Sequence, residues 1–287
     1  MISTKQTDKI DSFFSIRLFF SPKSPILLLN SGRFQHIAPM KVTRYLLLMF
    51  SFFSFFGCGK TPQYPTDTIQ TKNGTELTFR FFAHASLAIE ANGTYIYVDP
   101  VMEHADYSSL PKADIVLVTH HHSDHFDRAA VDELTTRQSE VVCDRTSAEA
   151  FEMNCHTMRP GSVATPREGI HIEAVAAYNT SEGHTQFHPQ AREDCGYILT
   201  IDGTRIYIAG DTELTPEMKA LKAIDIAFLP VNQPYTMTVD QAVEAVKAIR
   251  PAIFYPYHYG QVEEKTDLER LKAELEGVTE VRIFPME

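Results

Sequence analysis

The sequence HHHSDH begins at His120 and is separated from the apolar run IVLV by Thr119 alone. In an extended loop, His120 and His122 point to one side of the backbone and His121 points to the other. Asp124 and His125 then enter the beginning of a helix and face a neighbouring direction. Imidazole nitrogen together with carboxylate oxygen suits zinc, iron or manganese. The loop therefore predicts ligands for two metal ions, with His121 turned away from both.

Two further apolar runs also end in residues that can bind a metal. Gly210 and Asp211 follow the run IYIA, and His258 follows FYPY. If the ends of these predicted strands share one edge with the first loop, their side chains converge. A carboxylate such as Asp211 can bridge two ions, and two ions about 3.5–4 Å apart hold and activate a bridging water. This combination predicts a dinuclear centre built for hydrolysis.

The elements that must position these residues follow from the apolar patterns. We expect strands at 77–82, 86–90, 95–98, 114–119, 141–143, 170–177, 197–201, 205–209, 224–229, 253–257 and 281–284. Helices are expected at 126–136, with Ser123 as N-cap, and at 146–153, 216–221, 238–249 and 265–276. Because many strands join as hairpins, the order favours two packed mixed sheets with helices outside over a doubly wound parallel sheet. GxGxxG and GxxxxGKS/T are absent, so a nucleotide-binding fold has no support.

The spacing of the first loop, H-x-H-x-D-H, resembles the signature of the metallo-β-lactamase superfamily. Other segments resemble landmarks of that family in the same order: YVDP with Asp99, GDT with Asp211, and YPYHYG with His258. FFAHASLAIE, with His84, is similar to the segment that opens a lactonase-like subgroup. That subgroup includes the ascorbate-phosphate lactonase-like and acyl-phosphatidylethanolamine phospholipase D-like hydrolases. The resemblance extends over about residues 77–285.

The resemblance implies an α/β fold of the αββα type, in which two sheets lie between helix layers. It also implies the ligand sets: His120 and His122 for the first metal, Asp124, His125 and His258 for the second, and Asp211 as the bridge. Asp124 is the expected catalytic residue, because it would orient the water or take its proton. Asp99 is expected to brace the loop, and His84 to support the ligands from outside or to contact substrate.

One ligand of the first metal stays open. Members of the family supply a histidine from the loop after the strand expected at 170–177, where this chain has Asn179. The same loop offers His184, in a GHT motif that resembles the usual ligand motif, and His188, in an FHP motif that resembles a subgroup motif. The sequence leaves the choice open, with a slight preference for His188.

The expected activity is metal-dependent hydrolysis of an ester, a lactone or a phosphodiester by two divalent ions. Zinc is the expected metal, with manganese or iron as alternatives. Two rival hypotheses are an iron-dependent oxidoreductase, similar to sulfur dioxygenases, and a non-catalytic binding lipoprotein. Hydrolysis of β-lactams is not expected.

The N-terminal part has the pattern of an export signal. Lys41 and Arg44 precede the mainly apolar segment 45–56, which is too short to span a bilayer as a helix. The ending FFGC resembles a bacterial lipobox, so residues 1–57 are expected to be an upstream segment and a signal peptide. Cys58 would carry the lipid. Residues 58–76 would form a tether, and residues 77–287 would form the hydrolase domain. The protein would then be exported and anchored by lipid in the bacterial cell envelope, with Met40 as the true start.

The net charge and the cysteine content restrict the classes of partner and the disulfides that we expect. Residues 1–57 hold 7 of the 26 Lys and Arg and 2 of the 37 Asp and Glu, so the rest has a net charge of 19 − 35 = −16. Such an acidic domain disfavours nucleic acid and leaves a small-molecule or lipid-like substrate as the expected partner. A disulfide between Cys143 and Cys155 stays open, although small buried residues are the default expectation for these cysteines and Cys195.

Overall fold

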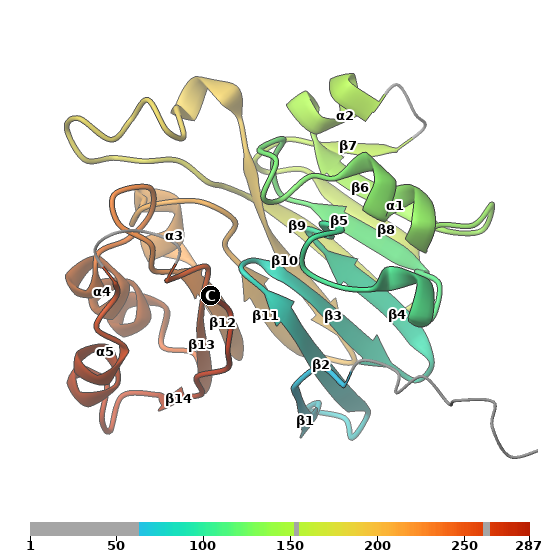
Figure 1. Cartoon of the computed structure of the whole chain (residues 1–287). Coiled ribbons are helices and arrows are strands. Elements are labelled where there is room, and N and C mark those ends of the chain that lie inside the picture. The colour runs from blue at the N-terminus through green and yellow to red at the C-terminus, as the bar shows by residue number, and fades with distance from the viewer. Residues whose placement is uncertain (1–62, 152–154, 261–264) are drawn as a thin grey trace, which may run out of the picture. The chain divides into compact units, whose positions relative to one another are not determined.

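Two seven-stranded sheets pack face to face in the part of the chain that the structure describes (Figure 1). A computed structural model describes residues 63–151, 155–260 and 265–287, and these belong to one compact unit, Gly59–Glu287. The first sheet has the order β1-β2-β3-β4-β5-β6-β7, and the second has the order β14-β13-β12-β11-β10-β9-β8. Each sheet combines antiparallel hairpins with parallel strands.

The element bounds are as follows. The first sheet consists of β1 Thr66–Gln70, β2 Glu76–Ala83, β3 Ser86–Ala91, β4 Thr94–Val98, β5 Ile115–Val118, β6 Glu140–Asp144 and β7 His156–Met158. The second consists of β8 Val163–Arg167, β9 Ile170–Ala176, β10 Cys195–Ile201, β11 Thr204–Ile208, β12 Ile226–Pro230, β13 Ile253–Tyr257 and β14 Glu280–Val281. The helices are α1 Arg128–Leu134, α2 Arg145–Phe151, α3 Pro216–Ala220, α4 Val239–Ile249 and α5 Leu268–Glu274, with short 3-10 helices η1 Tyr107–Ser109 and η2 Gln190–Arg192.

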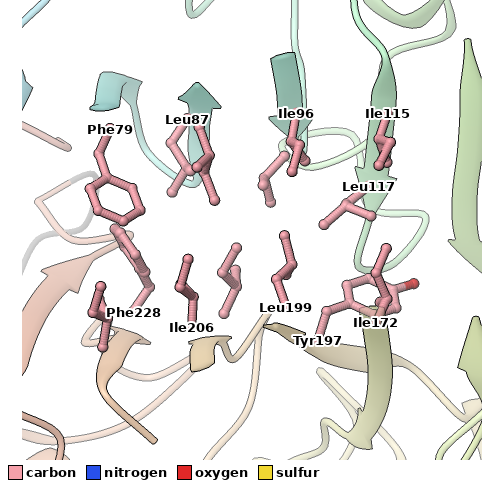
Figure 2. Close-up of a cluster of buried hydrophobic side chains, with 14 of the residues drawn as sticks. Phe79, Leu87, Ile96, Ile115, Leu117, Ile172, Tyr197, Leu199, Ile206 and Phe228 are labelled. Carbon is pink, nitrogen blue, oxygen red and sulfur yellow. The ribbon is translucent and has the colours of Figure 1, made fainter. Parts of the chain in front are cut away.

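The main core lies between the two sheets, where the inward-facing residues of alternating strands meet. Figure 2 shows Phe79, Leu87 and Ile115 of the first sheet facing Phe228, Ile206 and Ile172 of the second. In β2 the apolar residues at every second position are fully buried, as the two-residue period of a strand requires. Burying a large apolar side chain stabilises the fold by about 1.5–3 kcal/mol, so this layer contributes strongly to the stability.

Helices cover the outer face of each sheet, which gives the four-layer order. α1 buries Ala130, Val131 and Leu134 in a cluster against the outer face of the first sheet. α4, together with α3 and α5, forms a separate apolar cluster against the second sheet. A capping box at Thr238 and Gln241 fixes the beginning of α4. The predicted arrangement, two packed mixed sheets with helices outside, is confirmed.

Strand direction brings the carboxyl ends to a common edge. β4 through β7 run parallel to one another in the first sheet, and β11 through β14 run parallel in the second. The carboxyl ends of parallel strands meet at the same edge of a sheet, which is where loops gather functional side chains. The residues that follow β5, β11 and β13 therefore lie at such edges.

Three expectations about the elements need correction. The expected tether, residues 58–76, includes strand β1, which pairs with β2 from Thr66 to Gln70. The composition of this segment, rich in Pro, Thr and Gln, is typical of a linker and did not indicate a strand. Ile69 of this strand packs against the main core. The N-cap of α1 is Asp127, whose side chain accepts from the backbone N–H of Ala129, and is not Ser123. Strands β7 and β8 were not expected.

The expected signal peptide and the lipid site at Cys58 lie outside the described residues. Within the residues that the structure does describe, no helix is both long and apolar enough to cross a membrane.

Candidate metal centre

The first group of possible ligands comes from both sheets. His120 and His122 follow β5 of the first sheet, and His188 lies on the loop between β9 and β10 of the second. One nitrogen of each ring lies within 4.8 Å of the others. The Nε2 of His188 is also 3.3 Å from Oδ2 of Asp211. These four residues could hold one divalent ion.

The second group is joined to the first through Asp211. Its members are His84, Asp124, His125 and His258, whose ligand atoms also lie within 4.8 Å of one another. Oδ1 of Asp211 is 3.2 Å from Nε2 of His125 and 3.3 Å from Nε2 of His258. Since its Oδ2 faces His188, Asp211 presents one oxygen to each group.

Unpaired polar atoms at the middle of the cluster fit a pair of cations. Within the described part of the chain, the buried Nε2 atoms of His120, His125, His188 and His258 lack a hydrogen-bond partner, as does Oδ1 of Asp211. Leaving a buried polar atom unpaired costs about 1–3 kcal/mol, so five such atoms around one point need an explanation. Imidazole and carboxylate donors suit zinc, manganese or iron, and bound ions would satisfy all five atoms.

A buried carboxylate sets the orientation of His125. Asp99 is fully buried and accepts a hydrogen bond of 2.8 Å from Nδ1 of His125. The backbone N–H and the hydroxyl group of Thr119 also donate to Asp99, at 2.8 and 2.7 Å. A histidine that donates from Nδ1 keeps the lone pair of Nε2 free for a metal. Asp99 is therefore a brace for the loop and lies outside the ligand groups.

The two carboxylates of the centre stay ionised. Burial alone would raise the pKa of Asp211, but the charges of His125 and His258 outweigh it and hold the pKa well below its usual range. Burial likewise opposes ionisation of Asp124, yet the nearby rings of His258 and His84 lower its pKa. In return, Asp211 raises the pKa of His125 and His258 in spite of their burial. Metal binding at this group would therefore release protons.

Two histidines of the first group have lowered pKa values instead. Burial lowers the pKa of His120 well below its ordinary value. Burial, together with the charge of Arg192, lowers the pKa of His122 to about 4. Both rings are neutral at pH 7. Nε2 of His120 keeps a free lone pair, whereas Nε2 of His122 accepts from Nη1 of Arg192, which would have to release this ring for it to bind a metal.

The backbone is strained at three residues around the centre. His84, Asp99 and His258 have φ angles of +56°, +43° and +51°, in the left-handed region that residues with a side chain rarely adopt. Such conformations cost of order 1–3 kcal/mol each and gather at functional sites. They turn the chain sharply at the carboxyl ends of β2, β4 and β13.

A cavity of about 430 Å³ opens onto the cluster. Beside members of the cluster (His84, His122, Asp124, His188, Asp211 and His258), its walls are formed by Gln186, Phe187, Asn232 and Tyr235. The rings of Phe187 and Tyr235 meet edge to face with centroids 4.9 Å apart. Among the described lining residues there is neither a lysine nor an arginine.

The structure separates the three alternatives for the last ligand. His188 is 2% exposed and belongs to the first group. His184 lies outside every group, and its Nδ1 is 3.2 Å from Oε1 of Glu213. Asn179 supports His188, with its Oδ1 3.3 Å from Nδ1 of that ring. The expectation that His184 could be a ligand is therefore not met by this geometry.

The structure also places His121 and His84 relative to the ligand groups. His121 is exposed, belongs to no ligand group, and its Nδ1 is 3.2 Å from Oγ1 of Thr146. Nε2 of His84 is 3.1 Å from Oδ2 of Asp124, and its side chain lines the cavity, so both expected roles stay predictions.

Sequence reasoning missed several neighbours of the cluster. Nη1 of Arg192 is 2.8 Å from Nε2 of His122, and the same guanidinium group pairs with Asp194. No motif marks Arg192. Asn232, by contrast, closely follows β12, and its Nδ2 lies 3.2 Å from Nδ1 of His258. The rule that found Asp211, a polar residue just beyond a buried strand, would have found it too.

Most of the described chain is similar to known proteins. Residues 78–258 match the β-lactamase superfamily domain. A relative from Thermoplasma acidophilum, named a UPF0173 metal-dependent hydrolase, is 35% identical over 189 residues, which cover 62% of this chain and 82% of the relative.

Two solved structures are similar as well. A Parabacteroides distasonis protein, provisionally named a metal-dependent hydrolase, is 46% identical with a TM-score of 0.74, and the match covers 78% of this chain and all (100%) of that one. A metallo hydrolase from Ignicoccus hospitalis is 25% identical with a TM-score of 0.61, and the match covers 74% of this chain and 96% of that one. This chain therefore belongs to the β-lactamase superfamily and, within it, to the UPF0173 metal-dependent hydrolase family.

Proposed function

We propose that this protein hydrolyses its substrate with a dinuclear metal centre. His120, His122 and His188 would hold the first ion, Asp124, His125 and His258 the second, and Asp211 would bridge them. The observation that carries the proposal is the ring of buried, unpaired Nε2 atoms around Asp211. When bound, two divalent ions supply an activated bridging water and polarise the group to be cleaved.

Asp124 has the position of a proton acceptor in this scheme. Its side chain is 42% exposed, while the other carboxylate of the cluster, Asp211, is buried. It lines the cavity and is held ionised. His84 is buried and donates to it from Nε2, which fixes the direction of the carboxylate. Asp124 is therefore able to orient the attacking water or to take its proton.

The walls of the cavity support an uncharged ester or lactone as substrate. Phe187 and Tyr235 form an aromatic edge beside the metal ligands, and Gln186 and Asn232 add amide groups that can orient a carbonyl. A phosphodiester, the third expected class, carries a negative charge for which the described lining offers no lysine or arginine. The lactonase-like subgroup is part of this proposal, and it rests on the FFAHAS segment and the cavity wall.

The test combines elemental analysis of the purified protein with a panel of ester, lactone, phosphodiester and β-lactam substrates. We expect two metal ions per chain and hydrolysis of an ester or lactone. Asp124→Asn should lower kcat by at least about 100-fold, whereas His121→Ala, in the same loop but turned away, should retain the activity. An Asp124→Asn protein with unchanged hydrolysis would refute the role of Asp124, and a single tightly bound ion would refute the dinuclear centre.

The same measurements separate the rival hypotheses. Iron as the bound metal, together with oxygen uptake in the presence of a thiol substrate, would favour an oxidoreductase. Metal binding without any turnover that Asp124→Asn abolishes would favour a binding protein.

We also propose that the protein is exported and anchored by a lipid at Cys58. The proposal rests on the basic, apolar and small-residue pattern of residues 40–58. Mass spectrometry of the mature N-terminus tests it: a lipid on Cys58 supports the anchor, and residues 1–39 on the mature protein contradict it.

A further inference from the structure

Cys143 and Cys155 bring their sulfur atoms close together on the outer face of the first sheet. Cys143 is buried in β6, and Cys155 is half-buried just before β7. Their Sγ atoms are 3.0 Å apart, and both are free thiols. We propose that these two residues form a dithiol that a small-molecule disulfide oxidises to an intrachain disulfide bond.

The backbone already holds the two sulfur atoms in position. β6 and β7 are parallel neighbours, and Cys143 lies opposite Thr157. Cys155 comes two residues before Thr157 and therefore lies diagonally across from Cys143. Cys143 belongs to the apolar cluster on the outer face of the first sheet, and Cys155 packs against that cluster. The side chains therefore point to the same face. A disulfide bond is about 2.05 Å long, so closing it requires a movement of about 1 Å.

The pair contains both a nucleophile and a resolving thiol. The Cys143 thiol donates a hydrogen bond to the sulfur of Cys155 at 3.0 Å, and this lowers the pKa of Cys155 below that of an ordinary thiol. Cys155 is the more exposed of the two, so it is the sulfur that an oxidant reaches. A thiolate, not a thiol, attacks a disulfide.

The reaction is a pair of exchanges. The Cys155 thiolate attacks one sulfur of the oxidant, forms a mixed disulfide and releases one thiolate. Cys143 then gives up its proton to that thiolate and attacks the Cys155 sulfur, which forms the intrachain bond and expels the second thiolate. The dithiol loses two electrons, and the oxidant is reduced to two thiols.

The disulfide would tie down the segment that carries α2. That helix begins two residues after Cys143. Its first residues contact the metal loop and its surroundings: Oγ1 of Thr146 is 3.2 Å from Nδ1 of His121, and Nε of Arg145 is 3.4 Å from Oε2 of Glu193. Oxidation would therefore fix both ends of a segment that borders the centre.

The third described cysteine is an internal control. Cys195 is buried in β10, and burial raises the pKa of its thiol. It lies at the beginning of a strand in the other sheet and donates to the backbone carbonyl of Glu193. A reagent that oxidises Cys143 and Cys155 should leave Cys195 as a thiol.

The experiment equilibrates the full-length protein with oxidised or reduced glutathione, alkylates it after denaturation, and maps tryptic peptides without reduction. Arg145 lies between the two cysteines, so trypsin separates them into different peptides. In the oxidised sample we expect these two peptides to be joined, with a mass two hydrogen atoms below their sum, and Cys195 to be alkylated. In the reduced sample, all three residues should be alkylated.

Thermal melts give an independent readout. Closing the loop between Cys143 and Cys155 with a disulfide should raise the melting temperature by roughly 6–10 °C in wild type and in Cys195→Ser. Cys155→Ser, a nearly isosteric change at a half-buried residue, should abolish the shift. Alkyl groups or glutathione on both Cys143 and Cys155 in the oxidised sample would overturn the proposal. So would a linkage between two chains, or a temperature shift that survives Cys155→Ser.

Discussion

Two histidines on one loop, His184 and His188, provide a sharp test of the metal centre. The Nε2 atom of His188 is buried, unpaired and 3.3 Å from Asp211, whereas the side chain of His184 is 30% exposed and bonded to Glu213. Four-ligand zinc sites are stabilised by about 10–16 kcal/mol, an average of about 3 kcal/mol for each ligand. Replacing His188 by alanine should therefore weaken binding of the first ion by about 100-fold or more.

His184→Ala is the matched control. The change removes one imidazole from the same loop, and at a partly exposed residue it should alter metal affinity by less than about threefold. Zinc affinity can be measured by competition with a chromophoric chelator, with metal content determined after gel filtration. Thermal melts of the metal-free proteins would show that both variants fold. A His188→Ala protein that binds two zinc ions like wild type, or a larger loss in His184→Ala, would refute the assigned ligand set.

Other residues give predictions that need no knowledge of the substrate. Asp99→Asn removes the carboxylate that accepts from His125, so zinc affinity at the second position should fall by about 10–100-fold in the same competition assay. Gly196→Ala would place a Cβ atom 2.5 Å from the backbone oxygen of Ala209, and urea unfolding should show a loss of at least about 2 kcal/mol. Hydrogen bonds from the β1–β2 turn lower the pKa of Asp202 from 3.8 to about 2, so its contribution is present above pH 3.8 and is lost as the pH falls toward 2. Urea unfolding from pH 5 to 2 should therefore be less pH-dependent in Asp202→Asn than in wild type.

Sequence patterns indicated which side chains lie close together where the candidate ligands follow buried strands. Asp211 and His258 come after apolar runs that form β11 and β13, so strand direction alone brings them to one edge. The sequence could not choose between His184 and His188, because the conformation of the loop between β9 and β10 depends on contacts with Asn179 and Tyr235.

The errors in the fold have equally local causes. The segment with β1 has a composition typical of a linker, and only pairing with β2 and the packing of Ile69 make it a strand. Ser123 and Asp127 are both good N-cap residues, and the loop that carries the ligands delays the helix until the second of them. Arg192 reaches His122 from a loop that no sequence pattern marks.

The split of the ligands between two sheets has a consequence for how the protein matures. His120, His122, Asp124 and His125 are synthesised early, whereas His188, Asp211 and His258 come from the second sheet, the last of them after β13. A growing chain therefore carries the histidine-rich loop long before either proposed ion would have its complete set of ligands. Retention of the proposed second ion would then report that β13 has docked, and a chain cut before β13 should fail to retain that ion.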